Sequence, residues 1–186
     1  MNSALLISVR ALNKTFEVGL RGCTARARAL VDLQLDIARR EIVGVVGHAG
    51  AGKTTLLRSL AGLLAGDSGI IERAAMAEDD VARVVYLHDP LELSRFLAGG
   101  DRWDIAAVDN ADGVLGDVSG SFAILAAARH ARSVGGAMIL AARDERAIAS
   151  IADRLIVLER GRVRDGRSGA SIAVTRVAEA TSSSSR

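Results

Sequence analysis

Apolar residues recur along this chain in two patterns, alternation and short continuous runs. Residues 31–37 alternate Val, Leu, Leu and Ile with polar side chains, which predicts a strand with one buried face. Residues 41–46 (EIVGVV) form a nearly continuous apolar run, which predicts a strand buried on both faces. The apolar, β-prone residues 4–12 are also interpreted as a strand. The chain is therefore predicted to open with strands.

Helices are predicted to alternate with strands after residue 46. The spacing of apolar residues predicts a helix over 53–64, with further helical segments at 91–98, 121–133 and 145–152. Apolar runs predict buried strands at 82–87, 104–108, 137–141 and 154–158. Strands separated by helices imply right-handed crossovers and a largely parallel sheet. The opening strands, with no helix between them, predict an antiparallel addition at one edge.

Composition narrows the class of protein. The 186 residues are 49% hydrophobic and 25% charged, which is the balance of a globular domain. A net charge of +2 and an aromatic content of 3% argue against nucleic-acid binding, which needs a basic field or stacking aromatics. The arginines of residues 21–40 are interpreted as a solvated strand face.

Cysteine content and hydropathy predict the compartment. Cys23 is the single cysteine, which excludes an internal disulfide and is interpreted as an inert thiol. No apolar run reaches 18 residues, and residues 1–10 lack the pattern of a secretory signal. We therefore expect a cytoplasmic protein without direct membrane insertion.

Residues 47–54 (GHAGAGKT) fit the phosphate-loop pattern G-x-x-x-x-G-K-[ST], between a predicted buried strand and a predicted helix. Glycines let successive backbone N–H groups face phosphates, and the helix N-terminus adds partial positive charge. Lys53 is predicted to reach the β- and γ-phosphates, and the Thr54 hydroxyl to ligate Mg²⁺. A glycine-rich turn before a core helix is the alternative. The candidate nucleotide-binding residues here are Gly47, His48, Ala49, Gly50, Ala51, Gly52, Lys53, Thr54 and Thr55.

A phosphate-loop protein also needs an acidic residue at the end of a neighbouring buried strand. Asp109 follows the apolar run 105–108 and is the candidate second residue of the Mg²⁺ site. An exposed carboxylate in a turn is the alternative interpretation. The predicted fold class is α/β of the P-loop NTPase type, with a mostly parallel sheet, helices on both faces and an antiparallel β edge.

Several blocks together resemble an ABC-type ATPase, the ATP-binding cassette of ABC transporters, over about residues 5–165. The resemblance implies an ATP-binding domain over residues 1–166 with ATP and Mg²⁺ as ligands. Phe16 matches the position whose aromatic ring stacks on adenine, although a core or edge aromatic would look the same. Residues 167–186 are predicted to be a disordered tail. The matching blocks are residues 29–37, 55–57, 60–64, 66–71 and 152–163, together with the phosphate loop.

The middle of the chain departs from that family. Lys53 and Asp109 lie 56 positions apart, about half of the separation usual in such ATPases. The helical subdomain and its signature motif are therefore predicted to be missing around residues 90–100. His88 stands where the family has the glutamine of its glutamine loop.

Residues tied to hydrolysis also differ. Asn110 replaces the catalytic glutamate, Arg143 replaces the switch histidine, and Asp117 comes one place late for the D-loop aspartate. Because asparagine cannot accept a proton from water, we expect nucleotide binding with turnover near background. A partner, or a shifted acid such as Asp112, is the alternative source of the missing group. The sequence does not decide whether the chain is an enzyme.

Two kinds of function are consistent with these residues. The first is an ATP-binding subunit of an ABC transporter, peripheral to the inner face of the membrane through a permease subunit and paired with a full-length ATPase. The second is a nucleotide-sensing or scaffolding module not coupled to transport. A small-molecule kinase would need a lid of several arginines, and Arg95 and Arg102 are too few.

Overall fold

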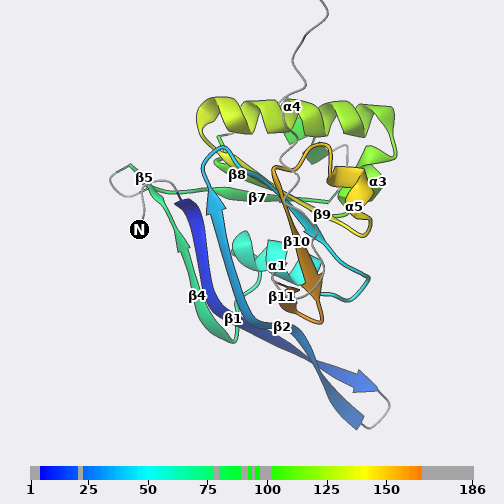
Figure 1. The fold of residues 1–186 in the computed structure, drawn as a ribbon. Coiled ribbons are helices and arrows are strands. Elements are labelled where there is room, and N and C mark those ends of the chain that lie inside the picture. The colour runs from blue at the N-terminus through cyan, green and yellow to red at the C-terminus, as the bar shows by residue number, and fades with distance from the viewer. Residues whose placement is uncertain are drawn as a thin grey trace, which may run out of the picture.

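The centre of the molecule is a six-stranded sheet with the order β11-β10-β3-β9-β8-β7 (Figure 1). The computed structural model describes residues 5–20, 23–77, 80–88, 92–93, 95–96 and 102–164. Strands β10 to β7 run parallel, and β11 joins the edge antiparallel to β10. The predicted mostly parallel sheet is therefore confirmed. The strands are β3 (Ile42–Val46), β7 (Val84–Leu87), β8 (Ile105–Val108), β9 (Ala137–Ala142), β10 (Arg154–Glu159) and β11 (Arg162–Arg164).

The middle strands of this sheet are buried on both faces. Every residue of β3, β8 and β9 is buried, and none of them carries a charged side chain. Such strands read as continuous apolar runs because helices or a second sheet cover each side. This explains why the sequence located all of the parallel strands to within two residues.

The opening strands form a second sheet of their own. Strand β1 (Leu5–Leu20) pairs antiparallel with β2 (Cys23–Ala38) on one side and with β4 (Ser68–Arg73) on the other. These strands are antiparallel, as predicted, but they face the parallel sheet and do not extend its edge (Figure 1). The alternation in residues 31–37 accounts for this position, because Leu33, Leu35 and Ile37 need one covered face.

The β1–β2 hairpin is about twice as long as the sequence predicts. Each strand has 16 residues, and paired positions continue from Thr15↔Arg28 to Leu20↔Cys23. This outer half of the hairpin extends past the rest of the molecule (Figure 1), and Glu17 and Arg26 are exposed there. Pairing between the two strands satisfies their backbone hydrogen bonds although the side chains are not buried. The sequence of these residues therefore has no apolar pattern that would predict a strand.

The helices cover both faces of the parallel sheet, as predicted. Helix α1 (Lys53–Leu60) lies between the two sheets, whereas α3 (Ala111–Leu115), α4 (Val118–Val134) and α5 (Glu145–Ile148) lie on the opposite face (Figure 1). The helix predicted over 53–64 ends at Leu60 because Gly62 adopts a left-handed φ of 76°. Helix α4 is longer than the predicted 121–133 because the Asp117 carboxylate caps it at Gly120 N.

Alternating residues of the parallel strands face two separate cores. Val43 and Val45 of β3 pack with Leu56 and Leu57 of α1 and with the antiparallel sheet. Ile42 and Val46 face the other way, toward the helical layer that includes Ile124 of α4. Successive side chains of a strand point to opposite faces of the sheet. The parallel sheet therefore packs against a layer on each side, which gives the fold three layers.

Some elements lie beyond the sequence predictions. Strands β4, β11, β5 (Ala75–Ala77) and β6 (Asp80–Val81) and helix α3 are short or exposed and were not predicted. Half of the helix predicted at 91–98 and the whole predicted tail at 167–186 lie outside the described residues, and residues 92–93 and 95–96 are helical as predicted. None of the helices in the described part of the chain is long and apolar enough to cross a membrane.

The N-cap of α4 provides a test of the fold. Replacing Asp117 by Ala removes the oxygen that accepts from Gly120 N at 3.1 Å, so the free energy of unfolding should fall by about 1 kcal/mol. Asp117→Asn keeps an acceptor and serves as the control, with a smaller loss. Urea denaturation measures both. Equal losses in the two variants would show that the cap contributes nothing specific.

Candidate functional site

A cavity of about 550 Å³ opens where the phosphate loop meets the carboxyl ends of the parallel strands. Residues from four parts of the chain line it: the hairpin, the loop with the start of α1, the end of β8, and the end of β9. They are Phe16, Ala29, Ala49, Gly50, Ala51, Gly52, Lys53, Thr54, Thr55, Asp109, Asn110, Asp112, Ala141 and Arg143. Most of the predicted site residues thus share one cavity, while Gly47 and His48 lie outside its lining.

The glycines of the loop are required by its geometry. Gly50 and Gly52 have φ of 76° and 106°, in the left-handed region that L side chains rarely adopt. A Cβ at Gly52 would collide with the Ala29 carbonyl oxygen, and a Cβ at Gly47 would collide with that of Leu158. Gly52 is the N-cap of α1 and offers no side chain to its first turn, which also lacks an acidic residue. The N-terminal N–H groups of α1 are therefore free of side-chain caps, and the helix dipole points at the cavity.

Lys53 is folded onto the loop that precedes it. Its Nζ donates to the carbonyl oxygens of Gly47, at 2.5 Å, and His48, at 3.0 Å. Burial lowers the pKa of Lys53, the carboxylates of Asp109 and Asp112 oppose this shift, and Arg143 adds to it. The ammonium group carries three N–H donors, so two loop carbonyls leave one donor for an anion in the cavity.

Asp109 receives hydrogen bonds from three neighbours. Thr54 Oγ1 donates to its Oδ2 at 2.6 Å, Tyr86 Oη donates to the same oxygen at 2.9 Å, and Asn110 N donates to Oδ1 at 3.0 Å. Asp109 is 8% exposed, so these contacts satisfy a nearly buried carboxylate. Burial raises the pKa of Tyr86, its hydrogen bond with Arg58 opposes this rise, and Asp109 reinforces it. The turn-carboxylate alternative therefore does not describe Asp109.

These oxygens suit a magnesium ion held jointly with a ligand. Thr54 and Asp109 present hydroxyl and carboxylate oxygens, which are the hard donors that Mg²⁺ prefers. Within the described ranges, no group of three His, Cys, Asp or Glu residues is placed to hold a metal by itself. The donor set thus fits an ion that keeps several waters and takes further ligands from substrate phosphates.

Phe16 reaches the cavity from the hairpin. Phe16 is 38% exposed, and Lys14 Nζ lies 5.6 Å from the centroid of its ring. Asp67 holds Lys14 in this position by an ion pair of 2.9 Å. A ring exposed at a cavity that also contains the phosphate loop could stack on a flat ligand. The position of Phe16 differs from that of a core aromatic.

Three further polar residues, Asn110, Asp112 and Arg143, line the cavity. Asn110 has a left-handed φ of 53° and is the N-cap of α3. Asp112, in the first turn of α3, accepts a hydrogen bond from Arg143 N at 3.3 Å. The part of the chain that the structure describes provides no hydrogen bond or ion pair for the Arg143 guanidinium. The cavity thus contains cations from Lys53 and Arg143 and carboxylates from Asp109 and Asp112.

The sequence patterns did not predict that Tyr86 and Ala29 lie at or beside this cavity. Tyr86 lies on β7, whose register pairs it with Ala107 of β8, so parallel pairing brings its side chain near Asp109. His88, two residues later, is exposed and lies outside the cavity lining, with Nδ1 3.0 Å from Glu92 Oε2. The side chain of Cys23 lies outside the described residues.

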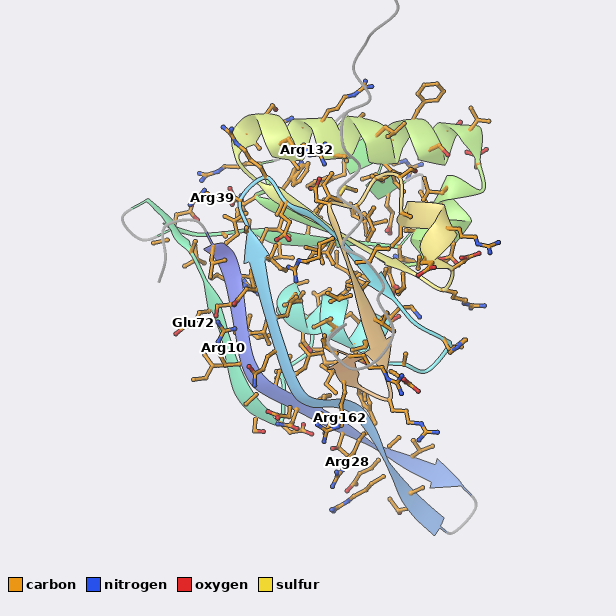
Figure 2. All side chains as sticks on the ribbon, in the orientation of Figure 1. Arg10, Arg28, Arg39, Glu72, Arg132 and Arg162 are labelled. Atoms are coloured by element: carbon orange, nitrogen blue, oxygen red, sulfur yellow. The ribbon has the colours of Figure 1, made fainter. Side chains whose placement is uncertain are left out.

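The charged residues of the outer surface are distributed over several elements. Figure 2 shows Arg10 and Glu72 on the antiparallel sheet, Arg132 on α4, Arg28 on β2 and Arg162 on β11. Arg10 and Arg132 form ion pairs with Asp36 and Asp153 at 2.6 Å each. Arg26 and Arg28 are exposed on β2, as predicted for a solvated strand face, whereas Arg40 lies in the turn after β2 and Arg21 lies outside the described residues.

Comparison with known proteins finds similarity to the same family that the sequence motifs resemble. Residues 30–117 match the family model described as ABC transporter. The energy-coupling factor transporter ATP-binding protein EcfA1 of Lacticaseibacillus paracasei is 39% identical over 71 residues, which are 38% of this chain and 23% of that protein. The methionine import ATP-binding protein MetN 1 of Acinetobacter baylyi is 44% identical over 66 residues, 36% of this chain and 17% of that protein. The chain therefore matches less than a quarter of the length of these relatives.

Solved structures show the same fold. The ATP-binding cassette MJ0796 bound to ADP and Pi has a TM-score of 0.65 at 15% identity, covering 86% of this chain and 97% of that one. CbiO1 from Clostridium perfringens, part of the transporter complex CbiONQ, has a TM-score of 0.63 at 16% identity, with 88% of each chain covered. Residues 30–117 thus match the ABC transporter family, and the chain shares the fold of solved ATP-binding cassettes.

Proposed function

We propose that this chain binds Mg²⁺–ATP in the cavity beside the phosphate loop and hydrolyses it no faster than background. The hydrogen bond of 2.6 Å between Thr54 and Asp109 carries the proposal, because it brings together the two candidate Mg²⁺ residues. The uncapped start of α1 and the free donor of Lys53 would bind the phosphates. Residues 47–55 form the phosphate cradle in this proposal, and Phe16 stacks on the adenine.

The absence of turnover follows from Asn110 and Arg143. Asn110 lines the cavity, and by resemblance to the family it stands where the catalytic glutamate would be. An amide cannot take a proton from the attacking water. General-base help of that kind contributes about 10²–10⁴ in rate. Arg143 provides a cation at the phosphate end of the cavity but no base. The site thus combines groups that hold an anion with the loss of a group that activates water.

The proposed protein partners rest on analogy with similar proteins. MetN 1 is by name an import ATP-binding protein, and CbiO1 is part of a transporter complex. By analogy, residues 1–166 would form an ATP-binding subunit on the cytoplasmic side of a membrane, associated with a permease subunit and a full-length ATPase. The short separation of 56 positions between Lys53 and Asp109 favours the second candidate, a nucleotide-sensing module without transport. A permease gene beside this one would support the first candidate.

Nucleotide binding should stabilise the fold. At a hundredfold excess of Mg²⁺–ATP over its Kd, the free energy of unfolding should rise by about 2.7 kcal/mol, measured as a shift in melting temperature. Lys53→Ala should remove most of the shift because it deletes the phosphate-binding ammonium group. Arg132→Ala deletes a cation on α4 that does not line the cavity, so ATP should shift the melting temperature of this variant as it does that of the wild type. An unchanged melting temperature of the wild type at millimolar ATP would contradict the proposal.

Phe16 should contribute to binding of the base and not of the phosphates. Phe16→Ala should weaken ATP binding by about 1–3 kcal/mol, the range for stacking of a base on an aromatic ring. The affinity for inorganic triphosphate should stay the same, because that ligand has no base. Phe122→Ala on α4 removes a ring that is 70% exposed and should change neither affinity. Calorimetric titration with both ligands distinguishes stacking from a general loss of the site.

Hydrolysis by the purified chain should stay near background. Asn110→Glu alone should restore little, because catalytic groups that act as a unit do not contribute additively. Release of phosphate in the presence of Mg²⁺–ATP measures the rate, with Lys53→Ala as the blank. Steady turnover that is lost in Lys53→Ala but kept in Asp112→Ala and Asp117→Ala would show that the site has another base. Turnover lost in Asp112→Ala would assign that role to Asp112.

A further inference from the structure

Tyr86 connects the candidate Mg²⁺ site to the layer beneath it. The residue lies on β7, beside β8, and its hydroxyl donates to Asp109 Oδ2 at 2.9 Å. The guanidinium of Arg58 lies 5.5 Å from the centroid of the Tyr86 ring and comes from α1, the helix that begins at Lys53. The side chain is thus positioned by β7 and α1 and ends at the carboxylate.

The hydrogen bonds of Asp109 show what the Tyr86 hydroxyl contributes. Oδ2 accepts from both Thr54 and Tyr86, and Oδ1 accepts from Asn110 N. An ionised carboxyl oxygen has two lone pairs, so these two hydroxyls use both acceptor sites of Oδ2. With two donors on one oxygen and a third on the other, the carboxylate has little freedom to rotate.

The orientation of Asp109 in turn determines how Thr54 faces the cavity. Thr54 has a single O–H, and the contact of 2.6 Å directs it at Asp109. Both lone pairs of Thr54 Oγ1 then remain available for a cation at the phosphate loop. If the carboxylate rotated, the Thr54 hydroxyl would turn with it or lose its acceptor.

We propose that Tyr86 is a positioning residue for the magnesium ion: by donating to Asp109 Oδ2, it holds that oxygen as the acceptor of the Thr54 hydroxyl, so that the lone pairs of Thr54 Oγ1 stay directed at the ion. The proposal rests on Mg²⁺–ATP binding at this cavity. Tyr86 neither lines the cavity nor touches the nucleotide in this scheme. Outer-shell hydrogen bonds of this kind orient metal ligands, and their removal commonly costs 10–100-fold in metal affinity.

Tyr86→Phe removes the hydroxyl, and with it the hydrogen bonds to Asp109 and Arg58, while keeping the ring that packs against Arg58. The measured quantity is the ratio of the ATP dissociation constant in EDTA to that in saturating Mg²⁺, obtained by calorimetry on the full chain. This ratio reports how much the metal strengthens binding. It should fall by about tenfold in Tyr86→Phe, whereas the dissociation constant in EDTA should change by less than twofold. An unchanged ratio would overturn the proposal.

Two controls separate positioning from a loss of stability. Ile124→Val shortens a fully buried side chain of α4 and should lower the melting temperature while leaving the ratio unchanged. In the Asp109→Asn background, Tyr86→Phe should have no further effect on the ratio, because Tyr86 acts through the carboxylate. An additive effect in the double variant, or a fall of the ratio in Ile124→Val, would refute the role of Tyr86. A wild type that binds no ATP even in Mg²⁺ would instead refute the proposed function on which this inference rests.

Discussion

The hydrogen bond between Thr54 and Asp109 connects two segments 55 positions apart, and the geometry of the site depends on it. It joins the N-terminus of α1 to the end of β8, although β3, which leads into α1, does not pair with β8. Strand β9 lies between them, and its residue at this level is Ala141, which lines the cavity. A small side chain there leaves room for Thr54 to reach Asp109, and the ends of three parallel strands thereby form one site.

The layered packing keeps these strand ends in place and brings the hairpin to them. Because β3 and β9 are buried on both sides, the antiparallel sheet must pack over α1 on one face of the parallel sheet. This packing places Ala29 of β2 against Gly52, where a Cβ would collide with the Ala29 carbonyl oxygen. The same strand pairing places Phe16, opposite Ala27, in the lining of the cavity. Burial of the core thus positions an exposed ring that contributes nothing to the core itself.

The cavity combines two cations with two carboxylates that already accept hydrogen bonds. Asp109 is engaged by Thr54, Tyr86 and Asn110, and Asp112 accepts the backbone N–H of Arg143. Lys53 directs two of its donors at loop carbonyls, and a third remains for a phosphate. Asn110 lines the same end of the cavity with an amide. Lys53 and Arg143 thus face the cavity as cations, while both nearby carboxylates already accept hydrogen bonds.

The sequence by itself determined the parallel strands and the phosphate loop, because both depend on local patterns. Buried strands need continuous apolar runs, and the loop at 47–54 needs glycines at fixed spacing before Lys53. The tertiary structure decided the rest. The outer half of the hairpin, β4 and β11 are held by pairing with distant strands, which leaves little pattern in an exposed segment. Tyr86 became part of the site through its register with β8, since strand pairing and not sequence distance determines which side chain reaches Asp109.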